Sequence, residues 1–375
     1  MISLRMKDSE LYKLVFRKRI HDKEKCYAEA QRLIKVCGEK GKKTLDLSNL
    51  ADLDAIPQEI EGLHNLTTLI IESDKLTKIP DFLGNLVSLK NININLQALG
   101  KDKPGYDIIL PETFQNLVNL QKLSISGNIK ELPQWIGNFE KLISLYVKSK
   151  HIQKFPHEVG RLKRLQNLAL WCREITELPD QIAECPLVTM SLGCSKLTSL
   201  PESFRNLKRL QSFLYQFDSI AELPELIWSW ESLSYLDLTM PIIEKIPENI
   251  SNLKRLAYFN ISKISIKKIP DYFMMLPLEY LSLKGTFESI PPSVGNLPNL
   301  KELYLSSPNL KSLPDSFEQL HSLRKLTVDA KSIKSLPTSL GGCSNLESIS
   351  IKSDCLTKLP TTFSKLEKLQ QIYLD

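Results

Sequence analysis

The chain has 375 residues, 42% of them apolar, so it is long and apolar enough to bury a sizeable core. Its net charge is +6, but residues 1–43 alone carry 13 basic and 6 acidic side chains. The remainder is therefore nearly neutral. This argues against a protein that follows a nucleic-acid backbone, because such a protein needs a basic stripe along its binding groove.

No apolar run reaches the roughly 18 residues that a membrane-spanning helix needs. The longest apolar run near the N-terminus, Leu14–Phe16, is too short for the core of a signal peptide. These features predict a cytoplasmic protein with no integral membrane segment. Secretion without a cleavable signal peptide is the alternative.

Residues 1–43 are predicted to form a basic, helical N-terminal segment. Within it, Asp22–Lys40 reads as an amphipathic helix that covers the open end of the following core, with one apolar stripe made of Cys26, Ala30, Leu33 and Cys37. Gly38 and Gly41 are its predicted stop signals. A second helix, at about Ser9–Arg19, is predicted ahead of it, and residues 1–21 have no assigned role.

The remaining residues, 44–375, contain a repeat. A proline recurs 14 times between Pro57 and Pro360, mostly at steps of 22 or 23 residues. Nine residues after most of these prolines begins an L-x-x-L-x-L segment, as in Leu165–Leu170. The longest step, from Pro80 to Pro111, predicts a protruding loop at Lys101–Asp107.

The spacing predicts the local structure. The L-x-L alternation places two apolar side chains on one face of a short strand. The proline has no N–H to donate, so it ends the hydrogen bonding between strands and begins a turn. One repeat cannot bury its leucines alone, so neighbouring repeats must stack. With Leu45–Leu47 as the first strand, this predicts 15 parallel strands on a concave face, with irregular or short helical segments on the convex face.

The repeat unit L-P-x-x-I-G-N-L-x-x-L-x-x-L-x-L resembles the 23-residue leucine-rich repeats of Ras-group, plant intracellular Ras-group-related and Roco proteins and of bacterial homologues. Residues 132–139 (LPQWIGNF) and 290–297 (IPPSVGNL) carry the resemblance well. It covers about residues 44–375 and implies an α/β solenoid of the leucine-rich-repeat horseshoe class. It says little about function, because this fold hosts many partners.

One departure from that family concerns the backbone between turns. The usual repeat has an asparagine three residues after the last strand leucine, and its side chain bonds adjacent turns. Only Asn128 fits this rule here, and other repeats have residues such as Asp74, Lys150 and Pro308. We therefore expect the turns to satisfy their backbone groups in other ways, such as with water, and to have looser geometry along that edge.

The sequence shows no catalytic constellation. Gly38–Thr44 resembles a phosphate loop only superficially, since its spacing is wrong and it joins a helix to a strand. The five histidines and seven cysteines show no metal or triad pattern. We therefore predict a non-enzyme with no cofactor and no metal.

Several cysteines and tryptophans are assigned to packing. The cysteines at leucine positions of the repeat are predicted to lie in the core: Cys185, Cys343 and Cys355. Cys172 and Cys194 are predicted neighbours in consecutive turns, either as two thiols in a cytoplasm or as a disulfide in an exported protein. Trp135 and Trp228 fall on the convex side, where we expect local packing; a second contact surface is the alternative.

The outward positions of the strands are the predicted binding surface. Tyr235, Tyr258 and Tyr280 occupy one such position in three successive repeats, so their rings should stack about 5 Å apart. Aromatic side chains near the centre of such a face are typical binding hot spots, although cross-strand stacking without a ligand is the alternative. The predicted partner-binding residues are Tyr146, Trp171, Leu214, Tyr235, Asp237, Tyr258, Asn260, Tyr280, Glu302 and Tyr304.

Together these features predict a non-catalytic scaffold or signalling module that binds a protein partner, and no nucleic acid, through its concave face. One alternative is the recognition part of a larger GTPase or ligase that continues past Asp375, as in Roco proteins and some bacterial effectors. Another is a bacterial exported factor that meets a host. The last strand, Leu369–Leu374, lacks a cap, which predicts self-association through this end.

Overall fold

The structure is a computed structural model that describes residues 19–96, 108–216 and 223–375, without the side chains of residues 240–242. The helix predicted at about Ser9–Arg19, apart from Arg19 itself, and the loop predicted at Lys101–Asp107 lie outside these ranges. The chain divides into two compact units. Unit 1 holds residues 1–152 and 161–165, and unit 2 holds residues 153–160 and 166–375.

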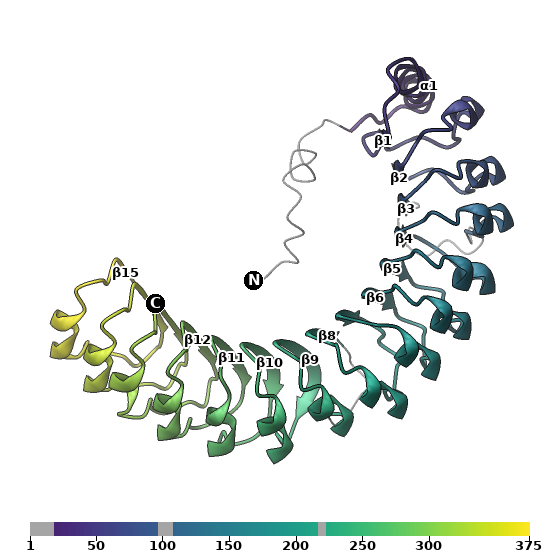
Figure 1. Ribbon diagram of the computed structural model, residues 1–375. Helices are drawn as coiled ribbons and strands as arrows, with labels where there is room; N and C mark the ends of the chain where they lie inside the picture. Colours follow the sequence, from purple (N-terminus) through teal and green to yellow (C-terminus); the bar gives the residue numbers. More distant parts are fainter. Residues whose placement is uncertain (1–18, 97–107, 217–222) are drawn as a thin grey trace. The chain divides into compact units, whose positions relative to one another are not determined.

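Unit 1 starts with helix α1 (Lys23–Glu39), followed by alternating parallel strands and 3-10 helices (Figure 1). Its strands pair in chain order, with Leu45 opposite Leu69 and Leu69 opposite Ile92. They are β1 (Thr44–Leu47), β2 (Thr68–Ser73), β3 (Asn91–Leu96), β4 (Lys122–Ser126) and β5 (Ser144–Ser149). The 3-10 helices are η2 (Gln58–Gly62), η3 (Asp81–Asn85), η4 (Glu112–Asn116) and η5 (Gln134–Asn138).

Unit 2 repeats the same build, with its strands on one side and its 3-10 helices on the other (Figure 1). The strands are β6 (Asn167–Cys172), β7 (Thr189–Leu192), β8 (Ser212–Gln216), β9 (Tyr235–Ile243), β10 (Tyr258–Ile264), β11 (Tyr280–Gly285), β12 (Glu302–Ser306), β13 (Lys325–Asp329), β14 (Ser348–Lys352) and β15 (Gln371–Leu374). The 3-10 helices are η6 (His157–Arg161), at the boundary of the units, η7 (Asp180–Glu184), η8 (Glu202–Asn206), η9 (Glu225–Ser229), η10 (Glu248–Asn252), η11 (Asp271–Met275), η12 (Pro292–Asn296), η13 (Phe317–Gln319), η14 (Thr338–Gly342) and η15 (Thr361–Lys365).

The fold is the predicted α/β solenoid, and the described residues contain the 15 predicted parallel strands. Each strand turns its alternate apolar side chains inward, as Leu236 and Leu238 of β9 do, both of them fully buried. The repeat proline ends the preceding segment and caps the next 3-10 helix, where its missing N–H is not needed. Its carbonyl accepts the first helical bond, as Pro57 does from the Ile60 N–H at 3.3 Å.

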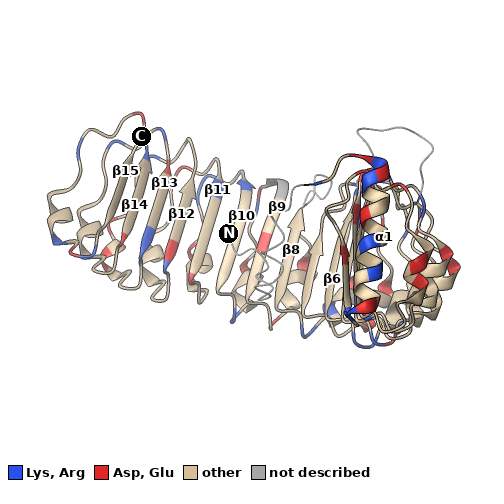
Figure 2. Cartoon of the chain, turned by 90° about the horizontal axis from the view of Figure 1, so that it is seen from above, with Lys and Arg blue, Asp and Glu red and all other residues tan. Residues whose placement is uncertain are grey.

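Helix α1 covers the first turn of unit 1, where it contacts β1 and η2. Asp22 caps its N-terminus by accepting a bond from the Lys25 N–H, and Gly41 leaves the helix with a φ of 56° that favours glycine. The buried stripe is Cys26, Ala30, Ile34 and Cys37. Ile34 thus takes the place of the predicted Leu33, which is half-buried at the side of the stripe; both spacings suit a helix, so the spacing alone could not decide between them. The charged residues of α1, coloured in Figure 2, are exposed or half-buried.

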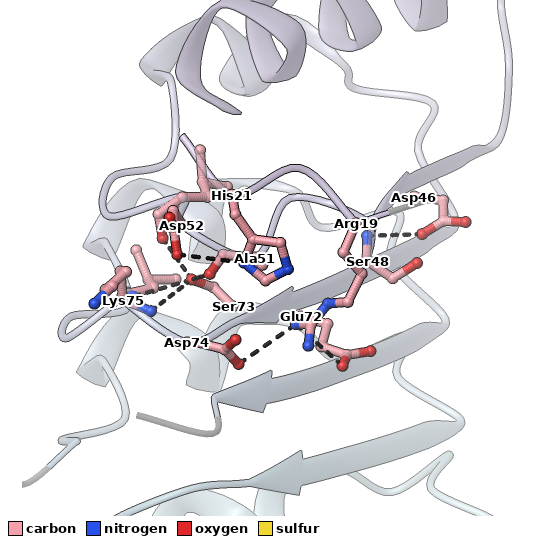
Figure 3. Close-up of polar contacts among 12 residues, drawn as sticks. Arg19, His21, Asp46, Ser48, Ala51, Asp52, Glu72, Ser73, Asp74 and Lys75 are labelled. Carbon is pink, nitrogen blue, oxygen red and sulfur yellow. Dashed lines mark hydrogen bonds and ion pairs between the residues drawn. The ribbon is translucent and has the colours of Figure 1, made fainter. Parts of the chain in front are cut away.

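The residues before α1 contact the turn after β1 and the end of β2, where Figure 3 shows Arg19 beside Glu72 and Asp74. Ile20 donates its N–H to the Asn49 carbonyl at 2.8 Å and accepts from the Ala51 N–H at 3.1 Å. Beside it, Arg19 forms ion pairs of 3.4 Å with both Glu72 and Asp74. The basic side chain before the helix is therefore held on acidic groups at the end of β2.

At four repeats a serine hydroxyl bonds one turn to the previous one, in place of the asparagine of the family rule. Ser73, Ser149, Ser307 and Ser353 each stand two residues after the last apolar strand residue and donate to a carbonyl 20 residues earlier, at 2.6–2.7 Å. Each hydroxyl also accepts an N–H from two residues ahead in its own turn. The expectation of loose, water-satisfied turns is therefore wrong at these repeats, because a shorter side chain one position earlier makes the bonds.

Cys172 and Cys194 occupy this same position, two residues after the last apolar residue of a strand. They stand where other repeats have these serines, and both are fully buried. Cys194 Sγ lies 3.8 Å from the Leu170 carbonyl, a weak contact to a different carbonyl from the one that the serines reach. Burial raises the pKa of the Cys194 thiol to about 11, so the thiol stays protonated near neutral pH.

Replacing Ser307 by alanine is expected to lower the free energy of unfolding by about 1–3 kcal/mol. The Ser307 side chain is buried, and its loss leaves the Phe287 carbonyl and the Asn309 N–H short of a partner. Urea unfolding followed by circular dichroism measures the change. Ser344→Ala, at an exposed serine of the same unit, is the matched control, and equal stability of the two variants would contradict the serine role.

The last described strand is more exposed than the others. The side chains of Ile372, Tyr373 and Leu374 on β15 are 48%, 58% and 54% exposed. Cys355, which precedes this turn, is also exposed, so its assignment to the core was wrong. Cys185 and Cys343 are buried as predicted. Self-association through β15 stays a prediction. Among the described residues, no helix is long and apolar enough to cross a membrane.

Candidate functional site

The outward face of β9, β10 and β11 in unit 2 carries a row of three tyrosines. The parallel register places Tyr258 directly opposite both Tyr235 and Tyr280. The rings stack with centroid distances of 4.1 and 4.2 Å and interplanar angles of 9° and 8°. We call Tyr235, Tyr258 and Tyr280 the tyrosine row.

The two ends of the tyrosine row differ from its centre. Tyr258 lies between two rings and is 7% exposed, whereas Tyr235 and Tyr280 are half-buried. Burial raises the pKa of Tyr235 to about 12 and also raises the pKa of Tyr258. Both hydroxyls are therefore neutral near pH 7, and a partner would meet ring edges and hydroxyl groups more than open ring faces.

Beside the row lies a half-buried polar pair. Asn260 donates from Nδ2 to Asp237 Oδ1 at 2.9 Å, and the Tyr235 hydroxyl lies 3.4 Å from Asp237 Oδ2. Burial raises the pKa of Asp237, and the hydrogen bonds from Asn260 and Tyr235 oppose this rise. Asp237 forms no ion pair with a cation among the described residues, and its hydrogen-bond partners there, Asn260 and Tyr235, are neutral.

Replacing Asp237 by asparagine is expected to stabilise the isolated chain at neutral pH. A carboxyl group whose pKa is raised by folding binds its proton more tightly in the folded state, so it costs stability as the pH rises through that pKa. An amide has no charge to desolvate and still accepts from Asn260. Urea unfolding at neutral pH should show the gain, and the gain should shrink at a pH below the ordinary aspartate value of 3.8.

Asp354→Asn is the control for simply removing a negative charge, because Asp354 is exposed in the same unit. A loss of stability in the Asp237→Asn variant at neutral pH would show that the carboxylate is stabilising, contrary to this reasoning.

The other predicted residues are spread over both units. Leu214 on β8 stands opposite Asp237, so it borders the polar pair. Glu302 on β12 stands opposite Tyr280 and is exposed, and it ends the tyrosine row. Tyr304 stands opposite Ser282, one outward position further along the strand, and is therefore beside the row and not part of it.

Trp171 and Tyr146 lie away from the tyrosine row. Trp171 is on β6 of unit 2, and its ring lies against Gly193 in the next turn, where an added Cβ would be 2.2 Å from the ring. Tyr146 belongs to β5 of unit 1. The structure thus brings together the predicted residues of β8–β12 around the row, whereas Tyr146 belongs to the other unit.

Unit 1 has a surface hollow that the sequence analysis missed. It has a volume of about 160 Å³ and lies over the outward face of β2–β5, with Asn93, Asn95 and Tyr146 among its lining residues. Only Tyr146 was predicted. The alternation Asn91-Ile92-Asn93-Ile94-Asn95 was the signal that could have revealed the rest, because it places three amides on one face of one strand.

The convex side is packed. Trp135 is 8% exposed and contacts Phe114 and Phe139 at centroid distances of 6.4 and 5.7 Å, and Trp228 is 2% exposed. The prediction of local packing is therefore confirmed for both. Within the described parts of the chain, no group of three or more His, Cys, Asp or Glu side chains is placed to hold a metal ion.

Comparison with known proteins gives related chains but no matching family model. The mouse protein "Leucine-rich repeat serine/threonine-protein kinase 1" is 26% identical over 311 residues, which is 78% of this chain. The chain spans 15% of the length of that kinase.

Solved structures show the same fold. A leucine-rich-repeat protein of Leptospira interrogans has a TM-score of 0.75 and 26% identity, covering 96% of this chain and 94% of its own. The internalin InlF of Listeria monocytogenes has a TM-score of 0.62 and 19% identity, covering 93% and 96%. The Drosophila Toll–Spatzle complex contributes a chain with a TM-score of 0.63 and 16% identity, covering 86% and 46%.

The repeat, the parallel sheet and these similarities define the class of protein: a solenoid of stacked strand-and-turn units. The chain is a leucine-rich-repeat protein.

Proposed function

We propose that the chain is a non-catalytic module that binds a protein partner through the outward face of β8–β12 in unit 2. The tyrosine row is the observation that carries this proposal. Three rings held in one stack lose little side-chain entropy on binding, and they offer a large amphipathic contact area. The half-buried Asp237 beside them forms no ion pair within the described residues, so a lysine or arginine of the partner would complete the site.

The comparisons are consistent with this proposal. The Toll chain, which has a similar fold, is in complex with Spatzle, so a solenoid of this kind can hold another protein. We also propose that the repeats belong to the 23-residue type that their sequence resembles.

A specific observation favours one second candidate, the recognition part of a larger enzyme such as a GTPase or ligase. The similar mouse protein is a kinase of which the matched region is a small share. In both proposals the same face recognises a protein. They differ in whether the natural polypeptide carries a further domain, and the mass of the native protein detected by immunoblotting would distinguish them.

The relationship to Leptospira and Listeria proteins keeps open the proposal of an exported bacterial factor beside that of a cytoplasmic one. The central test is affinity purification of the chain from its source cells, with mass spectrometry of the bound proteins. A purified partner should then bind the wild-type chain directly, and its binding should depend on the tyrosine row. A partner whose binding is independent of β8–β12 would overturn the proposed face.

A further inference from the structure

The hollow in unit 1 has the features of a second, chemically distinct binding site. It lies over four neighbouring strands, and Ile70 of β2, Asn93 and Asn95 of β3, Ser124 of β4 and Lys148 of β5 line it. Its volume is about 160 Å³. The lining is mostly neutral and polar, in contrast to the aromatic tyrosine row of unit 2, and the two sites share no residue.

The three asparagines of β3 are used differently. Asn91 is already satisfied, because its Nδ2 donates to Thr68 Oγ1 at 3.1 Å on the neighbouring strand. Asn95 has its Oδ1 atom buried without a hydrogen-bond partner among the described residues. A buried polar atom without a partner costs free energy, and a ligand that supplies the missing bond recovers it. Asn95 therefore points to a ligand that brings a hydrogen-bond donor into the hollow.

The geometry favours a peptide main chain as that ligand. Asn93 and Asn95 are two residues apart on one strand, so their amides repeat at about 6.6–6.8 Å. An extended peptide presents an N–H and a C=O group on one side with the same two-residue repeat. A side-chain amide has both a donor and an acceptor, so it can pair with both groups of a peptide unit.

The charges around the hollow indicate which peptide fits best. Glu72, which also lines the hollow, pairs with Arg19 at 3.4 Å; Arg19 also pairs with Asp74, so the charge of Glu72 is partly compensated. Lys148 on the opposite side is exposed. The local field therefore favours a negatively charged ligand side chain near β5, while Ile70 offers an apolar contact near β2.

We propose that this hollow binds an extended, acidic peptide segment, whose main chain runs along β3 and bonds to Asn93 and Asn95. An acidic side chain of the peptide faces Lys148. The site recognises backbone geometry, so it accepts several sequences that share an extended conformation and one acidic position.

The test uses the full chain and a phage-displayed library of random dodecapeptides. The library should yield acidic sequences, and a synthetic peptide of the most enriched sequence is titrated by calorimetry. The double variant Asn93→Ala/Asn95→Ala should weaken its binding by at least about tenfold, as expected for the loss of two or more hydrogen bonds. Asn91→Ala should leave the affinity unchanged, since Asn91 bonds within the sheet.

Two further measurements separate main-chain recognition from other modes. Two versions of the peptide are compared, one methylated at the odd-numbered backbone nitrogens and one at the even-numbered ones. The version whose methyl groups replace the N–H groups that face Asn93 and Asn95 should not bind, whereas the other version should bind. Lys148→Ala should lower the affinity and its salt dependence. Circular dichroism should show that every variant is folded, and Asn93→Ala/Asn95→Ala should be no less stable than the wild type, because it removes a buried oxygen that has no partner among the described residues.

Several outcomes would overturn the proposal. They are the absence of enriched peptides, unchanged affinity in the Asn93→Ala/Asn95→Ala variant, equal binding of both N-methylated registers, or binding of glycans in place of peptides on an array. Tyr235→Ala/Tyr280→Ala should leave peptide binding intact. Failure of this site is therefore distinguishable from failure of the proposed protein-binding face.

Discussion

Replacing Trp230 by alanine is expected to lower the free energy of unfolding by about 3–5 kcal/mol, the range for removing a large aromatic side chain from a core. Trp230 is completely buried at the end of η9. Its ring packs against Phe213 at a centroid distance of 4.9 Å and an angle of 77°, and Nε1 donates to the Phe204 carbonyl at 2.7 Å. Urea unfolding monitored by far-ultraviolet circular dichroism measures the loss.

Trp228, in the same turn, is the matched control. It is 2% exposed, but its Nε1 is buried without a hydrogen-bond partner in the described structure. Trp230→Phe should cost about 1 kcal/mol more than Trp228→Phe, because only Trp230 loses a satisfied bond, whereas Trp228 loses an unsatisfied donor. Equal costs for the two phenylalanine variants would show that ring volume alone, and not the Phe204 bond, determines the stability of this turn.

The repeat spacing predicted most of the fold because a solenoid is built from local rules. The L-x-L alternation sets which side chains face inward, and equal spacing makes equivalent residues neighbours on adjacent strands. For this reason the stacking of Tyr235, Tyr258 and Tyr280 could be predicted before any coordinates, and the register then placed them opposite one another. The register also places Tyr304 one outward position to the side of the row.

The bonding between turns could not be predicted in this way. The family rule directs attention to the third residue after the strand, and at that position most repeats lack asparagine. The structure instead uses the second residue, where Ser73, Ser149, Ser307 and Ser353 reach the previous turn. Which of two adjacent positions points at the neighbouring backbone depends on the local turn geometry, which composition does not reveal.

The hollow of unit 1 was missed for a different reason. A hollow forms where neighbouring strands carry side chains of unequal size, so it depends on four strands at once and not on a motif within one. Asn93 and Asn95 are unremarkable as single residues in the sequence. Their contrast with Asn91, which is satisfied by Thr68, becomes visible only when β2 and β3 are placed side by side.

The double variant Tyr235→Ala/Tyr280→Ala is expected to weaken binding of the protein partner by about 30-fold or more, equivalent to about 2 kcal/mol. These two residues form the half-buried ends of the tyrosine row, so they carry most of its accessible edge. Their removal also leaves Tyr258 without a ring on either side. Calorimetry or surface plasmon resonance with the purified partner measures the change, and circular dichroism checks that the fold persists.

Two controls identify what the partner recognises. Tyr373→Ala makes the same chemical change at an exposed tyrosine of β15, outside the predicted site, and should leave the affinity unchanged. Tyr235→Phe/Tyr280→Phe keeps the stacked rings and removes only the hydroxyl groups, so retained affinity would assign recognition to the ring edges. If the double alanine variant folds and binds as tightly as the wild type, the tyrosine row only packs ring against ring between neighbouring strands and does not bind the partner. The partner would then have to be sought on another surface of the solenoid.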